Sequence, residues 1–539
     1  MKFKVKKRIK YVLTLLVLLL FIVILRFDIV QVSNSIFYNK SSEKMNLTAE
    51  KKVEDFEYFF NVITSSMPML DSIEETYKID FSERKEYYLK AIKETKNDFE
   101  FYCVMSSIAN DIPSFHTDLV FPDYNNYTNL SCYHLQEMLC RSNLKPLTDY
   151  WYYLIENKFD EYKDMKVLEF KYIEGKYLFD IYYSSEEYSP YEGTQLVAID
   201  DIAINEYIAD KLSMWEREYD TKRDVPYRRF LTFNSDTGEK VSLKLRTTEG
   251  EIVICDAYID YSAECKSKYD FVFGGGEESE MVGSFYYEDK MNNIGYLYLE
   301  HFDETIINIL SERISEEKVI VDLRNNSGGL RKVISEYLHN KLFADDIVQT
   351  LEWYVPKSEA NQYVIQGNFT AVSIVNQFFH QTISYSPTKF RTDSISEFIQ
   401  GHSVITYKGN GKSNKTVYYL IGPNTGSAAD GYVSAVKEKG FGKLIGMNTA
   451  GEGLGASFYV DSLPNSGLVF IYMPCFAYNP DGTDNSVMGT SPDTYIEQTA
   501  ESFYKQRELQ IQGEDIFTYQ NRMIWDNVFL ETIEMIKNE

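Results

Sequence analysis

A serine flanked by small residues lies at a sharp turn in residues 425–430, Thr-Gly-Ser-Ala-Ala-Asp. The apolar run at residues 417–421 predicts a buried strand, and residues 428–439 predict a helix that ends before Gly440. A serine at such a joint can face a water-accessible pocket, and the unpaired N–H groups of the first helical turn can hold a developing negative charge. Ser427 is therefore a candidate nucleophile. The alternative is that Ser427 only caps the helix, as serine does at most such joints.

A histidine in a predicted loop is the second candidate for chemistry. Residues 50–112 have helical periodicity, and Pro113 ends the helix so that His116 lies on a loop before an extended stretch. The chain has only six histidines, and this one does not belong to an apolar face. A neutral imidazole can accept a proton near pH 7. A solvated loop histidine is the competing interpretation.

Two adjacent glycines follow a predicted strand. Residues 294–299 and 318–323 predict strands, and residues 304–314 and 330–342 predict helices, so the alternation indicates a parallel sheet covered on both faces. Gly328 and Gly329 fall at the carboxyl end of the second strand, where such sheets bind ligands and where glycine lets the backbone approach closely. No Gly-Lys-Ser/Thr follows, which excludes a phosphate loop.

Composition limits the classes of function. The chain has 539 residues with 44% hydrophobic and 15% aromatic residues, which predicts packed cores in three or four domains. A net charge of -26 argues against nucleic-acid binding, which needs a basic face. The six cysteines form no C-x-x-C, so we expect neither a zinc ribbon nor thioredoxin chemistry, and we expect no metal or cofactor. Disulfides within Cys132/Cys140 and Cys255/Cys265 stay open, because they depend on the compartment.

The N-terminus predicts a membrane anchor. An apolar run at residues 11–25 can extend through residues 27–30, and it follows six basic residues, Lys2, Lys4, Lys6, Lys7, Arg8 and Lys10. Positive charge before the run places the N-terminus in the cytoplasm and the remaining domains outside it. A cleaved signal peptide is the alternative, but no A-x-A-like cleavage site follows. We expect residues 1–30 to be a basic stub and an uncleaved transmembrane helix in the cell membrane.

The remaining chain divides by pattern. Residues 45–160 predict a helical domain that carries His116, and residues 165–262 predict a β domain. Within it, residues 193–204 resemble the core of a PDZ domain, whose sheet edge captures an extended peptide, and an ordinary small β domain is the alternative. Residues 262–280 are typical of a linker. Residues 280–500 form the strand–helix region, with an irregular insertion or lid at 345–415, and residues 501–539 predict a polar helical tail.

Several short motifs occur in one order along the chain. They comprise residues 293–302, ending in Phe302, residues 321–329 (Val-Asp-Leu-Arg-Asn-Asn-Ser-Gly-Gly), the serine turn at 425–430, residues 446–451, residues 463–467 (Leu-Pro-Asn-Ser-Gly) and residues 489–493 (Gly-Thr-Ser-Pro-Asp). Together they resemble the C-terminal processing (tail-specific) serine peptidases, in the branch that contains the tricorn core proteases. That family carries D-x-R-x-N-x-G-G, S-A-A-E, G-x-x-T-x-G, L-P-x-S-G and G-x-x-P-D, and this chain has Asp430 for the Glu of S-A-A-E. The resemblance covers roughly residues 50–500.

The resemblance implies a fold and a set of roles. It implies an α/β chain with a crotonase-like (Clp protease-like) catalytic domain, an N-terminal helical domain and an inserted PDZ-like module. Ser427 would be the nucleophile of a serine endopeptidase acting on proteins or peptides. The N–H of Ala428, with Gly328 or Gly329, would form the oxyanion hole, where one lost donor costs about 10²–10³ in rate.

The resemblance also bears on the general base. Many family members use a lysine after T-x-G, and that position is Glu452 here, so a Ser–Lys dyad is excluded. The branch without the lysine takes its base from an N-terminal D-G-H-T segment, which Ser-Phe-His-Thr around His116 resembles. The missing lysine and the present histidine are therefore consistent, and His116 would be the general base.

Two departures from the pattern leave alternatives open. The branch has a Glu that orients the histidine, and this position is Ser486, with Asp484 as the nearby candidate acid; Phe115 replaces the small residue before the histidine. Either Asp484 or an acid elsewhere orients His116, or the activity is low. A further alternative is a catalytically degenerate protein that binds peptides or acts as a sensor. A glycosidase is a distant third hypothesis, because no carboxylates form a recognisable pair.

Overall fold

The computed structural model describes residues 46–122, 145–162, 164–273, 283–361, 385–388, 398–412, 414–454 and 459–539. The predicted anchor at residues 1–30, the pair Cys132 and Cys140 and much of the predicted insertion lie outside these residues. Among the helices that fall inside them, none is long and apolar enough to cross a membrane.

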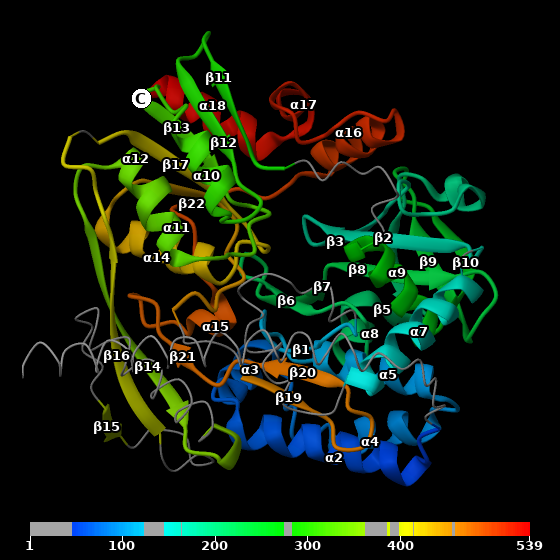
Figure 1. The fold of residues 1–539 in the computed structure, drawn as a ribbon. Coiled ribbons are helices and arrows are strands. Elements are labelled where there is room, and N and C mark those ends of the chain that lie inside the picture. Colours follow the sequence, from blue (N-terminus) through cyan, green and yellow to red (C-terminus); the bar gives the residue numbers. More distant parts are fainter. Residues whose placement is uncertain are drawn as a thin grey trace, which may run out of the picture.

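A six-stranded sheet carries Ser427 and the glycine pair (Figure 1). Its order is β11-β12-β13-β17-β18-β22, with β11 antiparallel to β12 and the other neighbours parallel. The parallel sheet predicted from the alternation is thus present with one antiparallel edge strand. The strands are β11 (Phe285–Asp289), β12 (Ile294–Tyr298), β13 (Lys318–Asp322), β17 (Thr416–Ile421), β18 (Lys443–Gly446) and β22 (Thr494–Tyr495).

Helices cover both faces of this sheet, which explains its continuous apolar strands. Alternate residues of β17 point to opposite faces: Tyr419 packs in one cluster and Tyr418 in the other. The first face is covered by α10 (Glu304–Ser311), the helical run α11 (Arg331–Val333), π-helical Ile334–His339 and α12 (Asn340–Leu342), and α14 (Ala428–Lys439). The second face is covered by α17 (Tyr519–Trp525) and α18 (Asn527–Asn538), so the C-terminal segment completes the core.

A buried ionic network ties the C-terminal helices to the strand that leads to the glycine pair. The Arg324 guanidinium donates to Asp322 and to Asp526, with distances of 2.7 Å and 2.6 Å from Nη2, and Arg522 Nη1 lies 2.8 Å from Asp526. Burial alone would raise the pKa of Asp322, but Arg324 and Arg522 hold it below its usual range. The Asp-x-Arg part of the signature is therefore a structural anchor at the end of β13.

The N-terminal helices pack on a segment from the far end of the chain. They are α2 (Ala49–Ser66), α3 (Leu70–Tyr77), α4 (Lys85–Glu94), α5 (Asp98–Asn110) and α7 (Lys145–Glu161). Thr48 and Asn97 cap α2 and α5 with side-chain oxygens, which explains where these helices begin. After α5 and the loop that carries His116, β1 (Asp118–Leu119) pairs with β20 (Val469–Tyr472), which pairs with β19 (Tyr459–Ser462). This pairing holds the His116 segment beside residues 459–472.

The middle β domain is a seven-stranded sheet in the order β3-β2-β8-β10-β9-β4-β5, and an extra β3–β4 pairing closes it into a barrel. Among the described strands, β5 pairs only with β4. The elements are β2 (Val167–Ile173), β3 (Lys176–Phe179), the 3-10 turn Glu186–Tyr191, β4 (Gln195–Ile199), β5 (Ile202–Ala203), α8 (Ile204–Asp210), β8 (Phe230–Asn234), β9 (Glu239–Arg246) and β10 (Ile252–Ile259). A separate hairpin, β6 (Arg217–Asp220) and β7 (Val225–Arg228), projects from this domain toward the sheet of Ser427.

Two expectations about connecting segments are wrong. The predicted linker at 262–280 begins with helix α9 (Tyr261–Phe273), because buried Ala263 and Cys265 give it an apolar side, and Cys265 belongs to the same core cluster as α5. Cys255 and Cys265 are free thiols. The predicted irregular insertion at 345–415 contains two paired ten-residue strands, β14 (Ile347–Pro356) and β16 (Phe398–Tyr407).

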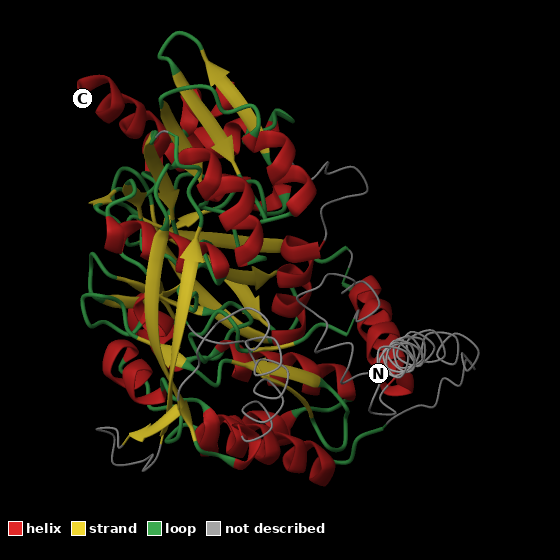
Figure 2. Cartoon of the chain, turned by 60° about the vertical axis from the view of Figure 1, so that its left-hand side comes forward, coloured by secondary structure: helices red, strands yellow, loops and turns green. Residues whose placement is uncertain are grey.

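These two strands form the long antiparallel ribbon that Figure 2 shows running along the molecule. They extend with β15 (Tyr385–Thr388) and β21 (Phe476–Ala477) into a four-stranded sheet. Along the first half of β14, residues alternate between buried and exposed, a pattern of period two that the aromatic composition concealed. The remaining helices are α15 (Asn485–Met488), near Ser427, and α16 (Ala500–Ile511), which packs Phe503 against the β domain.

Candidate active site

Ser427 lies at the turn between β17 and α14. Its backbone has φ +50° and ψ −124°, a left-handed region that residues other than glycine rarely adopt. Ser427 occupies the N-cap position, yet its side chain makes no capping hydrogen bond. The interpretation of Ser427 as only a helix cap is therefore wrong. A strained strand-to-helix turn that presents a serine is the geometry of a nucleophile elbow, where strain marks function.

The glycine loop after β13 lies against this turn. A Cβ atom on Gly328 would lie 2.9 Å from Ser427 Cβ and 3.0 Å from Ala428 N, so only glycine lets the two loops approach this closely. The N–H of Gly328 donates to Asn326 Oδ1 at 2.9 Å and is already engaged. Within the described part of the chain, the N–H groups of Gly329 and Ala428 have no hydrogen-bond acceptor. The oxyanion hole stays a prediction, and this geometry favours Gly329 with Ala428 as its donors.

His116 is held by Glu452, a residue whose contribution the sequence did not reveal. His116 Nδ1 lies 2.6 Å from Glu452 Oε2, and the His116 backbone N–H donates to the same oxygen at 2.8 Å. Ser114 Oγ donates to Glu452 Oε1 at 2.5 Å. The Glu452 side chain is fully buried and that of His116 is 14% exposed, so the solvated-loop interpretation of His116 is wrong.

Backbone hydrogen bonds bring the Glu452 loop beside Ser427. The N–H of Ser427 donates to Gly451 O at 3.0 Å, and that of Ala450 to Thr425 O at 2.9 Å. The Phe115 ring packs on the turn from the other side, since a Cβ on Gly426 would lie 2.5 Å from it. Among the described residues there is no hydrogen bond between Ser427 Oγ and the His116 ring, a contact that often tightens only when substrate binds.

Asp484 does not orient His116, contrary to the expectation. Its carboxylate caps α15 by accepting from Ser486 N at 2.9 Å. Burial raises the pKa of Asp484 to about 6, and the charge of Glu452 adds to the shift. The acid against the imidazole comes instead from the position of the family's lysine. The sequence did contain an indication of this role: Glu452 is an acid at the position where many members of the family have a basic lysine.

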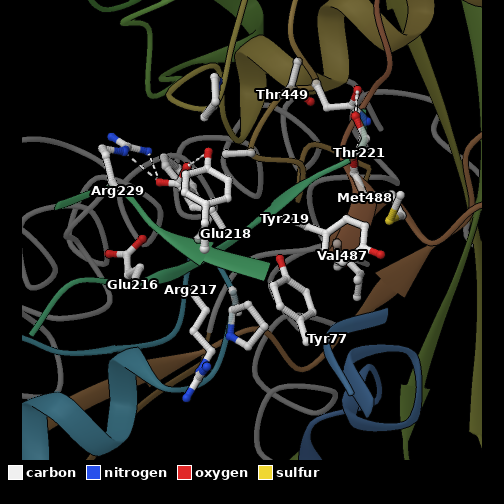
Figure 3. A pocket seen from close by; sticks show the side chains of 18 of the residues that line it. Tyr77, Glu216, Arg217, Glu218, Tyr219, Thr221, Arg229, Thr449, Val487 and Met488 are labelled. Atoms are coloured by element: carbon white, nitrogen blue, oxygen red, sulfur yellow. Dashed lines mark hydrogen bonds and ion pairs between the residues drawn. The ribbon is translucent and has the colours of Figure 1, made fainter. Parts of the chain in front are cut away.

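A cavity of about 230 Å³ lies beside these segments (Figure 3). The β6–β7 hairpin forms one side, where Arg229 Nε donates to Glu218 Oε1 at 2.7 Å. Ser114 and Phe115 also line the cavity, together with the turn that precedes Ser427 and the loop that precedes Glu452. The described residues contain no group of three His, Cys, Asp or Glu side chains that could hold a metal ion.

The comparisons with known proteins agree with the motifs. The model of peptidase family S41 matches residues 293–496. No curated protein matches the chain in sequence. Among solved structures, mature CPAF has 11% identity and a TM-score of 0.47, over 86% of this chain and 97% of that chain. The photosystem II D1 C-terminal processing protease has 13% identity and a TM-score of 0.32, over 84% and 94%.

The tricorn protease has 14% identity and a TM-score of 0.32, over 91% of this chain and 37% of that chain. The matched residues 293–496 contain the glycine pair, Ser427 and Glu452, which are the parts of the site that the sheet assembles. Residues 293–496 therefore match peptidase family S41, in agreement with the resemblance to the C-terminal processing serine peptidases.

Proposed function

We propose that the chain is a serine endopeptidase that cleaves polypeptides through an acyl-enzyme at Ser427, with His116 as general base and Glu452 as the acid that orients it. The observation that carries this proposal is the 2.6 Å contact between His116 Nδ1 and Glu452 Oε2, on a loop bonded to the turn of Ser427. A serine, a histidine and a buried carboxylate are the parts of a catalytic triad.

Each residue has a chemical step. With Nδ1 engaged by Glu452, Nε2 is the ring nitrogen that takes the proton of Ser427 as Oγ attacks the scissile carbonyl. The oxygen of the tetrahedral intermediate accepts from the N–H groups of Gly329 and Ala428. Glu452 stabilises the imidazolium that forms, and His116 then gives its proton to the leaving amine. Water, activated by the same nitrogen, hydrolyses the acyl-enzyme.

Two further parts of this proposal, the membrane anchor and the PDZ-like domain, come from the sequence. The basic residues before the apolar run at 11–25 support a single-pass membrane anchor with the peptidase outside the cytoplasm. The PDZ-like interpretation of the β domain has support from strand β5, which ends the sheet and, among the described strands, pairs only with β4. A peptide added to such an edge would be a substrate terminus.

The test is labelling of the full-length chain with a fluorophosphonate, which reacts with activated serines. We expect labelling of the wild type and none of Ser427→Ala or His116→Ala, with all three chains giving the same circular dichroism. A folded wild type without labelling would overturn the proposal, and so would unchanged labelling of Ser427→Ala.

A catalytically degenerate peptide-binding protein is the second candidate. The observation that favours it is the missing hydrogen bond between Ser427 Oγ and His116 among the described residues. It predicts that Ser427→Ala binds the same peptides and that the wild type does not react with the fluorophosphonate. The second argument for a degenerate protein was that Ser486 replaces the acid that orients the histidine. This argument is weaker because Glu452 contacts His116 instead.

A further inference from the structure

We propose that Asp430 is a positioning residue that sets the orientation of His116 through the Glu452 loop. The part of this inference that concerns the labelling rate rests on the proposed function, whereas the part that concerns the orientation of His116 does not. Asp430 lies on the first turn of α14, on the same helix that Ser427 starts. Its side chain is fully buried, so its partners are protein groups.

Four donors converge on this one carboxylate. Oδ1 accepts from Thr449 Oγ1 at 2.5 Å and from Thr490 Oγ1 at 2.6 Å. Oδ2 accepts from the backbone N–H of Gly453 at 3.0 Å and from Asn485 Nδ2 at 2.9 Å. A carboxylate is the side chain that offers two oxygens with enough lone pairs for this set.

The donors flank the acid of the proposed triad. Thr449 and Gly453 lie on either side of Glu452, so a single carboxylate fixes both ends of its loop. Glu452 itself has φ +59°, a strained conformation that persists only when its surroundings hold it. Gly431 adds close contact on the same helix, because a Cβ there would lie 2.5 Å from Gly453 O.

The carboxylate of Asp430 therefore connects the two halves of the site. One end of the connection is the helix that carries the nucleophile, and the other is the loop whose acid bonds His116 Nδ1. An amide in its place has a single acceptor oxygen: if its NH₂ group faces Thr449 and Thr490, their hydroxyl protons lose this acceptor, and if it faces Gly453, the backbone N–H there cannot rotate away. The loop would shift, and with it the hydrogen bond from Glu452 to His116.

The experiment compares Asp430→Asn, Glu452→Gln and the double variant in the full-length chain. The first readout is the low-field proton resonance of the His116 ring N–H bonded to a carboxylate, assigned by its loss in Glu452→Gln. The second is the rate of fluorophosphonate labelling. Asp55→Asn is the matched control, because Asp55 is also fully buried and accepts from Asn465 N at 2.7 Å and Ser466 N at 2.8 Å, in the N-terminal helical domain.

We expect Asp430→Asn to lose or shift the resonance and to slow labelling by about 10–100-fold, as small misplacements of catalytic groups do. The double variant should be no slower than Glu452→Gln alone, because both changes act through one contact. Asp55→Asn should keep the resonance and the rate. An Asp430→Asn chain that is folded and keeps the resonance would overturn the inference. If the wild type shows no labelling, the proposed function fails, and the resonance still decides the inference.

Discussion

Replacing Glu452 by glutamine tests the acid of the proposed triad. Glutamine keeps the shape of the side chain and can still bond Ser114 and His116, but it removes the negative charge that lies 2.6 Å from His116 Nδ1. It can also present its NH₂ group to the imidazole and favour the wrong tautomer. Both effects act on the base and leave the turn of Ser427 in place.

The size of the effect follows from the distance. At 2.6 Å and an effective dielectric constant of about 20, opposite unit charges attract by about 6 kcal/mol, which is an upper bound for the lost stabilisation of the imidazolium. Loss of the acid from a triad typically lowers the rate by about 10⁴, or about 5.5 kcal/mol of the barrier. We expect a decrease of this size in the labelling rate of Glu452→Gln.

The assay is the second-order rate of fluorophosphonate labelling of the full-length chain, with unfolding followed in parallel. Glu316→Gln is the matched control, because Glu316 is a buried acid that bonds Tyr286 and Ser315 at the other end of the sheet's strands. A folded Glu452→Gln chain that labels at nearly the wild-type rate would refute the assignment of Glu452 as the orienting acid.

Three further predictions concern the surroundings of the site. Asp484→Asn should change how the free energy of unfolding depends on pH. Burial raises the pKa of Asp484 from 3.8 to about 6 in the native state, so the protonated carboxyl contributes about 3 kcal/mol of stability below pH 4. This contribution is lost as the pH rises through about 6. Asp111→Asn should lower the free energy of unfolding by about 3–5 kcal/mol, because it leaves the buried Arg217 and Arg228 and the part-buried Arg84 without their shared carboxylate. Gly426→Ala should slow labelling, since its Cβ would lie 2.5 Å from the Phe115 ring, and adding Phe115→Ala should restore part of the rate.

Each of these predictions has a direct check. Urea unfolding from pH 4 to pH 7 follows the Asp484→Asn difference, and a difference that does not vary with pH would contradict the assigned ionisation. For Asp111→Asn the control is Asp346→Asn, whose pair with Lys408 is exposed and should contribute little; equal losses would contradict the argument from burial. For Gly426→Ala, no recovery in the double variant would show that the ring contact is not the cause.

Local sequence patterns predicted the helices, strands and turns whose conformation is set by residues close together in the sequence. The helix after Ser427 was expected at residues 428–439, and α14 spans Ala428–Lys439. Glycine, proline and small residues report backbone conformation within a few positions, so the turn of Ser427 and the glycine loop were visible as candidate site segments. The apolar strands in alternation with helices predicted a parallel sheet for the same reason.

Contacts between distant segments were decided only in three dimensions. Glu452 lies 336 residues from His116 along the chain, so the sequence could exclude a lysine there and could not show that the acid bonds the imidazole. The polar composition of residues 501–539 predicted a polar tail, but α17 and α18 have apolar faces that cover one side of the sheet. Helix α9 and the β14–β16 ribbon were missed because packing stabilised segments whose composition resembled linkers and loops. The residue types in the sequence indicated which reaction the chain can catalyse. Which side chains contact one another was decided by the tertiary structure, because it brings together segments that are far apart in the sequence.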